Sequence, residues 1–325
     1  MRKYRHNGFV LIVVLGTVLA LCVLLLGFNQ RSRTSLDKAD GFYRAAQAWN
    51  GAWGGLQIAA AIIRDANEAG VDPQATSLFT TENVFAVGDA NCSVVIAEEN
   101  GLLNVNRLTT ADAKPDRKHV DQFLRLIDAL NRDKKDAPPI SYGIVPAIID
   151  WVDSDDEVTC LPFVQHDNLG AENDSYQTQT PPYSCRNGPA DTVAELRWVK
   201  GMTPESFERL RPYLTCVGNG KIDINAAPKL VLQSLSEQMD AALADMVVRQ
   251  RKLKPFRDLS ELRSVPGMTD TICRDIENLS TVNPAQRFYR ATSQGSRQDH
   301  RCTIEALLRR NTQAGTVDII QYREL

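Results

Sequence analysis

The sequence lacks the short motifs on which most enzymes and metal proteins depend. It contains only four histidines, and none of its seven cysteines forms a Cys-x-x-Cys pair. No serine-nucleophile motif, phosphate-binding loop or His-Glu-x-x-His motif occurs in it. A zinc site, a thioredoxin-like redox site and an anchored hydrolase are therefore not supported. We expect a protein without enzymatic activity.

An excess of positive charge is also missing. The 325 residues carry a net charge of −3, and removing residues 1–8 would leave −6. A mildly acidic protein has no overall field that would attract nucleic acid. No long low-complexity tract occurs either, and the length predicts one large or two modest folded domains.

Charge disappears completely between Phe9 and Phe28. This run is longer than the core of a secretory signal, which has about 7–15 apolar residues, and no Ala-x-Ala site follows it. Leu21 before Cys22 also disfavours a lipoprotein signal. Twenty helical residues cross a bilayer of about 30 Å. Basic residues at positions 2, 3 and 5 predict a cytoplasmic N-terminus and place the main body outside the membrane.

The leader before the apolar run has only eight residues and ends in Gly8. This arrangement resembles the prepilins, in which a prepilin peptidase cuts after such a glycine and methylates the new N-terminus, here Phe9. Most proteins of that class carry a glutamate five residues after the cut, where this chain has Val13. A subunit without this carboxylate suits a position in which no neighbour has to pair with it. A plain membrane anchor followed by a helix is the alternative.

A long helix is predicted beyond the membrane span. Apolar residues recur at steps of three and four, and no proline occurs before Pro73. A helix from Phe9 to about Asp65 would be roughly 85 Å long at 1.5 Å per residue. We assign residues 9–28 to the membrane and residues 29–70 to the outer part of this helix. The apolar positions are Leu36, Ala39, Tyr43, Ala46, Trp49, Trp53, Leu56, Ala60 and Ile63.

The rest of the chain divides into strands and helices. Residues 84–108 contain β-rich runs with a turn at Glu99-Asn100-Gly101, and three strands joined by glycine-containing turns follow residue 286. The section between reads as helices. This order predicts an α+β protein in which residues 71–110 and 283–325 form a small domain and residues 111–282 form an inserted helical domain. Two sequential domains are less favoured, because three strands alone make a sheet too small to be stable.

The helical section contains a repeat, since Glu195-Leu-Arg-Trp-Val-Lys-Gly-Met-Thr203 returns as Glu261-Leu-Arg-Ser-Val-Pro-Gly-Met-Thr269. Each copy predicts a helix, a glycine turn and a threonine that caps the next helix. Both copies resemble helix-hairpin-helix motifs, and the stretch from Ile222 to Thr269 resembles the tandem hairpin module of membrane-anchored DNA receptors of the competence type. Acidic residues after the second glycine turn oppose phosphate binding, so we favour helices that only pack together.

Two acidic segments form a candidate metal site. Asp150–Glu157 contains five acidic residues and no basic one, and Gly170–Asp174 adds a second group. Excess oxygen ligands on irregular backbone suit Ca²⁺, which takes six to eight of them. The first segment imitates the start of an EF-hand loop but has Val158 where that loop needs glycine. A site would have to be built from both segments, and a solvated acidic loop remains the alternative.

Several motifs together resemble the K-type minor pseudopilins of type II secretion systems. They are Gly8 with Val13, ENGLLNVNRL, IIDWVDSDDE, GAEND, PPY, ELRWVKGMT, IDINAAP and the ending IIQYREL. The resemblance implies a pseudopilin fold, with a long N-terminal helix on a small antiparallel sheet and a large all-helical insertion. It also implies a single-pass protein of the inner membrane with a periplasmic body, at the tip of the pseudopilus with pseudopilins I and J, and without nucleic acid. Calcium binding in the helical domain is carried over to Asp153, Asp155, Glu157, Glu172 and Asp174.

Six cysteines lie beyond the apolar run, an even number that fits disulfide bonds in an oxidising compartment. Cys160 and Cys185 bracket the second acidic segment and form our preferred pair. The other four allow three pairings. Of these we choose Cys92 with Cys302 in the sheet and Cys216 with Cys273 in the helical section.

Overall fold

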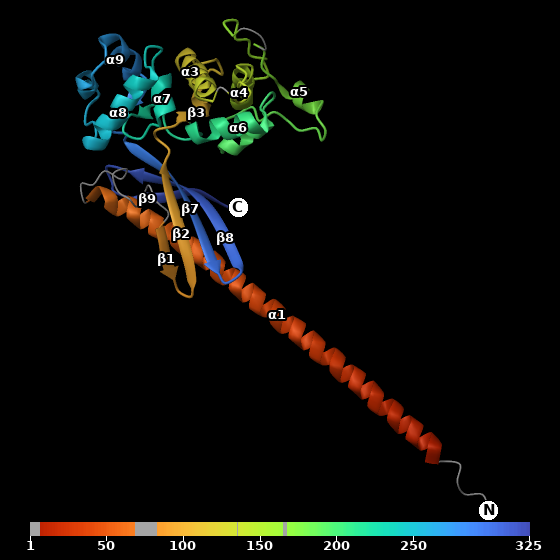
Figure 1. Cartoon of the computed structure of the whole chain (residues 1–325). Coiled ribbons are helices and arrows are strands. Elements are labelled where there is room, and N and C mark those ends of the chain that lie inside the picture. The colour runs from red at the N-terminus through yellow and green to blue at the C-terminus, as the bar shows by residue number, and fades with distance from the viewer. Residues whose placement is uncertain (1–6, 69–82, 135, 165–167) are drawn as a thin grey trace, which may run out of the picture.

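The computed structural model describes residues 7–68, 83–134, 136–164 and 168–325. Residues 1–6 of the predicted leader lie outside this range. Figure 1 shows a long helix, α1, that projects far beyond a compact body. A small sheet packs on the C-terminal part of α1, and a helical domain lies at the end of the sheet away from the N-terminus.

Helix α1 (Asn7–Glu68) confirms the predicted long helix. Its stretch Phe9–Asp65 contains an 18-residue window with a mean hydropathy of 3.2, and none of that window is buried within the protein. Apolar side chains that find no partner in their own chain need a non-aqueous environment or another protein. By length and composition this helix fits a single-pass membrane anchor.

Five antiparallel strands form the sheet, in the order β1-β2-β7-β8-β9. The predicted turn after β2 and the three predicted C-terminal strands are confirmed. Along the central strands, residues that face α1 are buried and alternate with more accessible ones, as the two-residue period of a strand requires. The strands are β1 (Asn83–Val87), β2 (Ala90–Glu98), β7 (Gln286–Arg297), β8 (His300–Asn311) and β9 (Val317–Glu324).

Small residues let α1 approach the sheet closely. Ala52 and Ala59 are fully buried at this contact. A Cβ added to Gly295 of β7 would lie 1.9 Å from the Ala48 carbonyl oxygen and 2.3 Å from the Ala52 nitrogen. Only a residue without a side chain allows the helix to lie at this distance from the strand. The core below it includes Leu56, Ile63, Val94, Ile96, Tyr289, Ile304 and Leu308.

The predicted bridge between Cys92 and Cys302 is wrong, because β7 lies between the two residues. Gly295 is the register partner of Cys92 on one side and of Cys302 on the other. Strands lie about 4.8 Å apart, so residues two strands apart exceed the Cα separation of at most about 7 Å that a disulfide allows. All seven cysteines of the described chain are free thiols.

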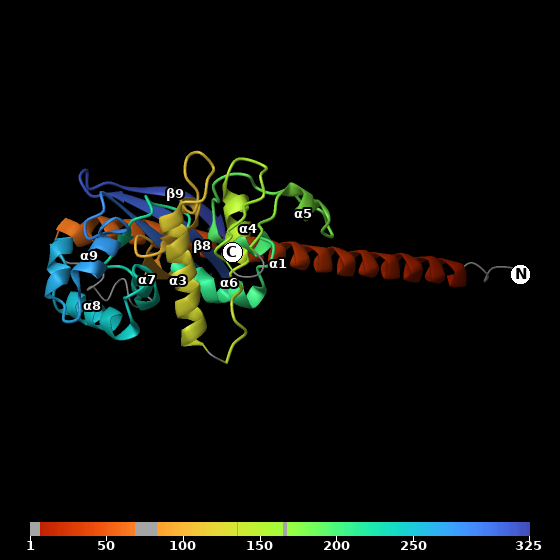
Figure 2. The same ribbon diagram turned by 90° about the horizontal axis from the view of Figure 1, so that it is seen from above.

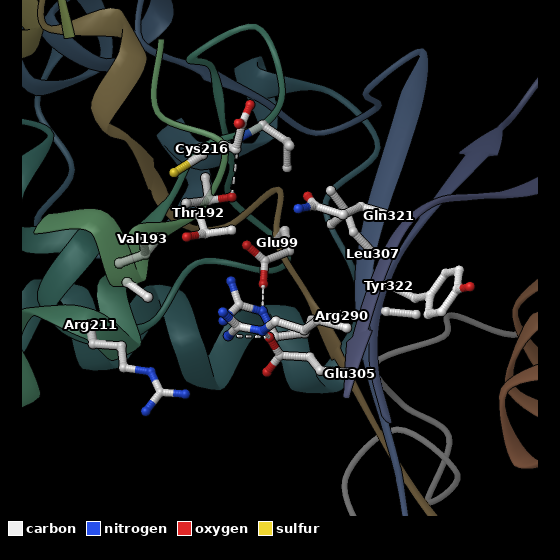
Figure 3. Close-up of a pocket in the computed structure, with 16 residues that line it drawn as sticks. Glu99, Thr192, Val193, Arg211, Cys216, Arg290, Glu305, Leu307, Gln321 and Tyr322 are labelled. Atoms are coloured by element: carbon white, nitrogen blue, oxygen red, sulfur yellow. Dashed lines mark hydrogen bonds and ion pairs between the residues drawn. The ribbon is translucent and has the colours of Figure 1, made fainter. Parts of the chain in front are cut away.

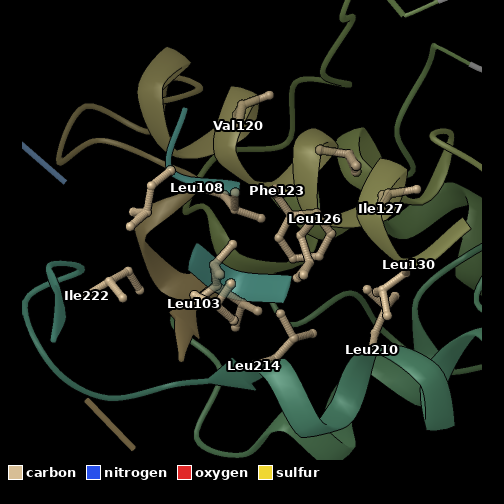
Figure 4. Close-up of a cluster of buried hydrophobic side chains, with 14 of the residues drawn as sticks. Leu103, Leu108, Val120, Phe123, Leu126, Ile127, Leu130, Leu210, Leu214 and Ile222 are labelled. Atoms are coloured by element: carbon tan, nitrogen blue, oxygen red, sulfur yellow. The ribbon is translucent and has the colours of Figure 1, made fainter. Parts of the chain in front are cut away.

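A second core belongs to the helical domain (Figure 4). Phe123 and Leu126 of the amphipathic helix α3 face Leu103 and Leu214 across this core. Two short parallel strand pairs, β3 with β4 and β5 with β6, join the helices. The prediction of an all-helical domain therefore missed these strands. The α-helices are α3 (Arg117–Asp133), α4 (Ile144–Val152), α5 (Asn173–Gln177), α6 (Pro204–Leu210), α7 (Lys229–Ser234), α8 (Ala241–Leu253) and α9 (Asp270–Glu277). The strands are β3 (Leu103–Asn104), β4 (Leu214–Thr215), β5 (Ile222–Asp223) and β6 (Ser280–Thr281), and the 3₁₀ turns are η2 (Val105–Arg107), η3 (Val193–Trp198), η4 (Arg211–Tyr213) and η5 (Leu259–Ser264).

The insertion begins earlier than the boundary predicted at residue 110. Leu103, Val105 and Leu108 are buried in the core of the helical domain. The chain passes from the sheet into the helical domain at Gly101. An added Cβ at this residue would lie 2.5 Å from the carbonyl carbon of Ala226. The small domain therefore gives way to the insertion near Gly101. The predicted range 71–110 also includes residues 71–82, which lie outside the described residues.

Polar contacts hold the two domains together at this junction. Arg287 lies 3.0 Å from Glu98 and 3.6 Å from Asp223, whose side chain is fully buried. Asn100 accepts a hydrogen bond from the Phe288 backbone at 2.6 Å. Figure 3 shows the adjoining pocket, in which the Arg290–Glu99 ion pair lies between the domains. The described chain thus fixes the helical domain against the sheet through buried or half-buried charges.

Candidate functional site

Three carboxylates meet where α4 ends and α5 begins. Asp150 lies in the last turn of α4, and Asp153 follows as its C-terminal cap with its N–H bonded to the Ile149 carbonyl at 2.9 Å. Glu172 precedes α5 as the N-terminal cap residue. One oxygen from each carboxylate lies within 4.8 Å of the others, and all three residues are buried. We call Asp150, Asp153 and Glu172 the carboxylate cluster.

The cluster is short of hydrogen-bond donors. Asp150 Oδ1 accepts a hydrogen bond from the Thr159 N–H at 2.9 Å. For Asp150 Oδ2 and for both oxygens of Asp153 and Glu172, the described residues supply no donor, although all five oxygens are buried. An unsatisfied buried polar atom costs about 1–3 kcal/mol, and charged ones cost more. Something other than the described side chains has to neutralise these oxygens.

The electrostatics give the same picture. Burial, with added repulsion from Asp150 and other nearby carboxylates, raises the pKa of Asp153 to about 7. The same causes raise the pKa of Glu172 to about 8, and burial also raises the pKa of Asp150. Like charges that are held together out of water disfavour ionisation. A bound cation reverses this effect, because it favours the ionised carboxylates.

The donor set fits a hard divalent cation. Three carboxylates offer up to six oxygens, and Ca²⁺ is bound by such oxygens, with water completing its shell. Near the cluster, Sγ of Cys185 lies 3.5 Å from the Asp150 backbone carbonyl oxygen and is positioned as a hydrogen-bond donor to it. A soft metal would want the thiolate instead, but burial raises the pKa of Cys185 to about 11. The chemistry of the cluster therefore favours calcium over zinc.

The structure brings together only part of the predicted ligand set. Asp153 and Glu172 belong to the cluster. Asp155 instead accepts a hydrogen bond from the Glu157 N–H at 2.8 Å, and Glu157 and Asp174 are exposed. Thus Asp155, Glu157 and Asp174 lie outside the carboxylate cluster.

The residue that sequence reasoning missed is Asp150. It stands three positions before Asp153, and this spacing places both side chains on one face of a helix. It is also the single charged residue of α4, all of whose residues are buried. A lone acid in an otherwise apolar helix was the signal that would have identified it.

The cysteines near the cluster form no bridge in the structure. Cys160 is exposed and Cys185 is half-buried, and both are free. Cys216 lies at the domain junction beside Glu195 and Glu99, whereas Cys273 lies on α9 beside Arg263 and Asp270, and these two are free as well. The different surroundings of Cys216 and Cys273 argue against their predicted bridge.

Both predicted hairpins are present. Gly201 and Gly267 have φ values of 80° and 89°, which other residues rarely adopt, and a 3₁₀ turn precedes each. Thr203 and Thr269 cap the following helices by accepting hydrogen bonds from Ser206 and Ile272 N–H groups.

The glycine turns lie at the surface of the helical domain, where Gly201 and Gly267 are exposed, but the Cβ position of each glycine points at a buried side chain. A Cβ added to Gly201 would lie 3.6 Å from Ile144 Cγ2, and one added to Gly267 would lie 3.5 Å from Leu243 Cδ1. These contacts fit a packing role for both hairpins, and the acidic residues after the second turn, such as Asp270 and Asp275, oppose phosphate binding.

Comparisons with known proteins identify the family. Two sequence models described as type II secretion system (T2SS), protein K, match residues 101–219 and 222–280, which together make up more than half of the chain. The chain belongs to the type II secretion system protein K family. The alternative of a competence-type receptor is not favoured by these matches.

Relatives of this family match along most of the chain. Type II secretion system protein K of Pseudomonas aeruginosa is 26% identical over 94% of this chain and 89% of its own length. The Klebsiella pneumoniae protein of the same name is 26% identical over 82% of this chain and 77% of its own length. A chain in the crystal structure of the GspK–GspI–GspJ complex of enterotoxigenic Escherichia coli is 18% identical, with a TM-score of 0.66 over 91% of this chain and 99% of that one. The structural match supports the predicted pseudopilin fold.

Proposed function

We propose that this chain is a minor pseudopilin located at the tip of the periplasmic pseudopilus, where it starts or caps the assembly, and that it acts without enzymatic activity. One observation carries the proposal. The helical domain lies beyond the sheet, at the end away from the apolar helix (Figure 1). A bulky domain in this position would obstruct a subunit stacked above it. It leaves the membrane-facing end of the sheet free for a subunit below. Val13 fits the same position, because nothing above the tip needs to pair with it.

The proposal includes a defined topology and processing. The basic residues of the leader keep the N-terminus in the cytoplasm, and the body lies in the periplasm. Prepilin peptidase cuts after Gly8 and methylates Phe9. Mass spectrometry of protein extracted from inner membranes should find a mature chain that begins with methylated Phe9. An intact Met1, or a cut near Phe28, would contradict a pseudopilin.

Pseudopilins I and J are the proposed partners. The similar crystal structure is that of a GspK–GspI–GspJ complex, and shared family membership supports the same association for the present chain. Full-length protein co-expressed with I and J should copurify with both from detergent extracts. A chain that is processed correctly but purifies alone would argue against the tip complex.

Calcium is the proposed ligand of the carboxylate cluster, with Asp150, Asp153 and Glu172 as protein ligands. The ion would join the end of α4 to the start of α5 and so order the loop between them. Calorimetric titration of EDTA-treated protein with Ca²⁺ should show one site, and Asp153→Asn should abolish it. Asp174→Asn is the matched control, because Asp174 is exposed and outside the cluster. Equal losses in both variants would mean that the ligands lie elsewhere.

A further inference from the structure

Two arginines lie just beyond the apolar part of helix α1. The charge-free run ends at Phe28, and the next charged residues are Arg31 and Arg33. The first acidic residue of the whole chain is Asp37, and the first lysine after the run is Lys38. A short stretch of positive charge therefore follows the apolar run, and no acidic residue lies within it.

Among the residues that the structure describes, neither of these arginines forms an ion pair. Both side chains are exposed, and this part of α1 stands clear of the body (Figures 1 and 2). The two other arginines of the described helix do pair. Arg44 forms ion pairs with Asp40 and Asp299. Arg64 lies 2.9 Å from Asp65. The first two arginines are thus the ones whose charge the described chain leaves unbalanced.

The two guanidinium groups lie at the level of the lipid headgroups. Residues 9–28 form a helical segment of about 30 Å, which equals the thickness of the hydrocarbon core, so Phe28 of an upright helix lies at the surface of that core. Arg31 and Arg33 follow at roughly 4.5 Å and 7.5 Å along the helix. The headgroup region is about 5–8 Å thick on each side of the core. Lys38 lies roughly 15 Å beyond Phe28 and therefore outside this region.

The two arginines point to different sides of the helix. Each residue turns an α-helix by about 100°, so residues 31 and 33 point about 160° apart. They can therefore contact two separate lipid molecules and do not compete for one. The residues beside them add no charge of either sign, and Thr34 donates its hydroxyl to the Gln30 carbonyl of the same helix at 2.9 Å.

The chemistry of the pair indicates an anionic phospholipid. A guanidinium group binds a phosphate through two parallel hydrogen bonds, and it is less strongly hydrated than an ammonium group. Basic residues at a membrane surface are attracted to anionic lipids. The phosphate of a zwitterionic lipid is already balanced by the ammonium of its own headgroup. Phosphatidylglycerol has no such internal cation, so an arginine gains more from binding it.

We propose that Arg31 and Arg33 bind the headgroup phosphates of anionic phospholipids in the leaflet next to the main body of the protein. The inference requires only that residues 9–28 span a membrane, and it does not depend on a place at the tip of a pseudopilus. Two lipids bound in this way fix the height of the span, and they have to be released before the span can leave the bilayer.

Two residues on one face of the helix provide a matched test. Arg31 and Lys38 are seven residues apart, so they point within about 20° of each other and differ mainly in height. The full-length protein is purified in mixed micelles with equal amounts of phosphatidylglycerol and phosphatidylcholine. Native mass spectrometry then counts the lipids that the protein retains. We expect the unsubstituted protein to retain phosphatidylglycerol in preference to phosphatidylcholine.

Three variants assign the binding to the arginines. Each basic residue near anionic lipid contributes about a factor of five, so Arg31→Gln should lower the retained phosphatidylglycerol about fivefold. The double variant Arg31→Gln with Arg33→Gln should lower it about 25-fold. Lys38→Gln should change it by less than about twofold, because the attraction falls off within a Debye length of the surface. All three side chains are exposed, so the substitutions should not disturb folding.

Several outcomes would overturn the proposal. One is equal retention of the two lipids by the unsubstituted protein, and another is an equal loss in Arg31→Gln and Lys38→Gln. Inorganic phosphate, added at the concentration of the lipid, should leave the bound phosphatidylglycerol in place, and displacement would mean a site for the free anion. If the double variant retains as much phosphatidylglycerol as the unsubstituted protein but copurifies poorly with pseudopilins I and J, the arginines bind another subunit and not lipid.

Discussion

At the scale of single residues, the carboxylate cluster depends on a glycine beside it. A Cβ added to Gly170 would lie 2.0 Å from Asp150 Oδ2 and 2.8 Å from the Pro146 carbonyl oxygen. Gly170→Ala should therefore push the Asp150 carboxylate away and weaken the proposed calcium binding about 10–100-fold, the usual effect of disturbing a ligand's support. Calorimetry measures this change. Gly188→Ala is the control, because the nearest atom lies 3.9 Å from its added Cβ, and an equal loss there would contradict the explanation.

The raised pKa values of the cluster predict how stability depends on pH. Asp153 and Glu172 have pKa values of about 7 and about 8 in the folded protein, against about 4 when unfolded. Between pH 4 and 8 the folded state binds more protons, so the metal-free protein loses stability as the pH rises. Each titrating group contributes roughly 1.4 kcal/mol per pH unit in this window. We expect the melting temperature in EDTA to be higher at pH 6 than at pH 8.

Two controls check this pH dependence. Saturating calcium should flatten or reverse the dependence, because the ion replaces the protons. The double variant Asp153→Asn with Glu172→Gln should lose most of it. A melting temperature in EDTA that rises from pH 6 to pH 8 would show that burial does not raise the pKa values of Asp153 and Glu172 as described.

Single residues also show where sequence reasoning stops. The segments that hold the cluster were predicted from composition, but the choice among their acids was not, since exposed and buried carboxylates look alike in a sequence. Asp153 and Glu172 of the predicted set lie in the carboxylate cluster, and Asp150, which also lies there, was not in that set. The difference between the acids of the cluster and the other acids of these segments is burial, which depends on how α4 packs against its neighbours.

At the scale of elements, the contact between α1 and β7 depends on Gly295. Its replacement by alanine would force the helix away from the strand, and overpacking of this kind costs about 1–3 kcal/mol. Gly295→Ala should lower the free energy of unfolding by about this amount in urea titrations of the full chain in detergent. Gly41→Ala is the control, because its added Cβ meets nothing within 4 Å. A helix-interior alanine there should leave stability unchanged or raise it by up to about 1 kcal/mol.

The elements with strong periodicity were predicted well. The 3.6-residue pattern of α1 and the two-residue pattern of β7, β8 and β9 arise from burial of one face, and burial is visible in a sequence. The pairing of Cys92 with Cys302 failed because it required the order of the strands. A sequence does not give that order when the strands are about 200 residues apart.

At the scale of the whole molecule, the junction between the domains depends on Arg287. Its guanidinium contacts Glu98 and the fully buried Asp223. Arg287→Ala leaves buried carboxylates without this partner and should cost about 3–5 kcal/mol in unfolding measurements. The control is Arg309→Ala, whose pair with Asp318 is exposed and should matter by less than about 1 kcal/mol. Similar losses in both would show that the junction does not depend on the buried pair.

The insertion was predicted as a whole, but its edge was not. Helices between strands indicate an inserted domain, because the strands need one another to form a sheet. The boundary at residue 110 followed the change from strand-like to helix-like sequence. Leu103 and Leu108 could fill an apolar core in either domain, so their sequence does not assign them. The structure has two separate cores, and both residues lie in the core of the helical domain.

The fixed junction has a mechanical consequence. Helix α1 is pressed against β7 at Gly295, and both chain crossings into the helical domain are held at Asn100 and Arg287. A force applied along α1 from the membrane side is then transmitted directly to the helical domain. Dyes attached to α1 and α9 should keep a constant separation by single-molecule energy transfer while a pseudopilus extends beneath them. The protein would move as one rigid body, and its displacement would equal the length that the pseudopilus gains below it.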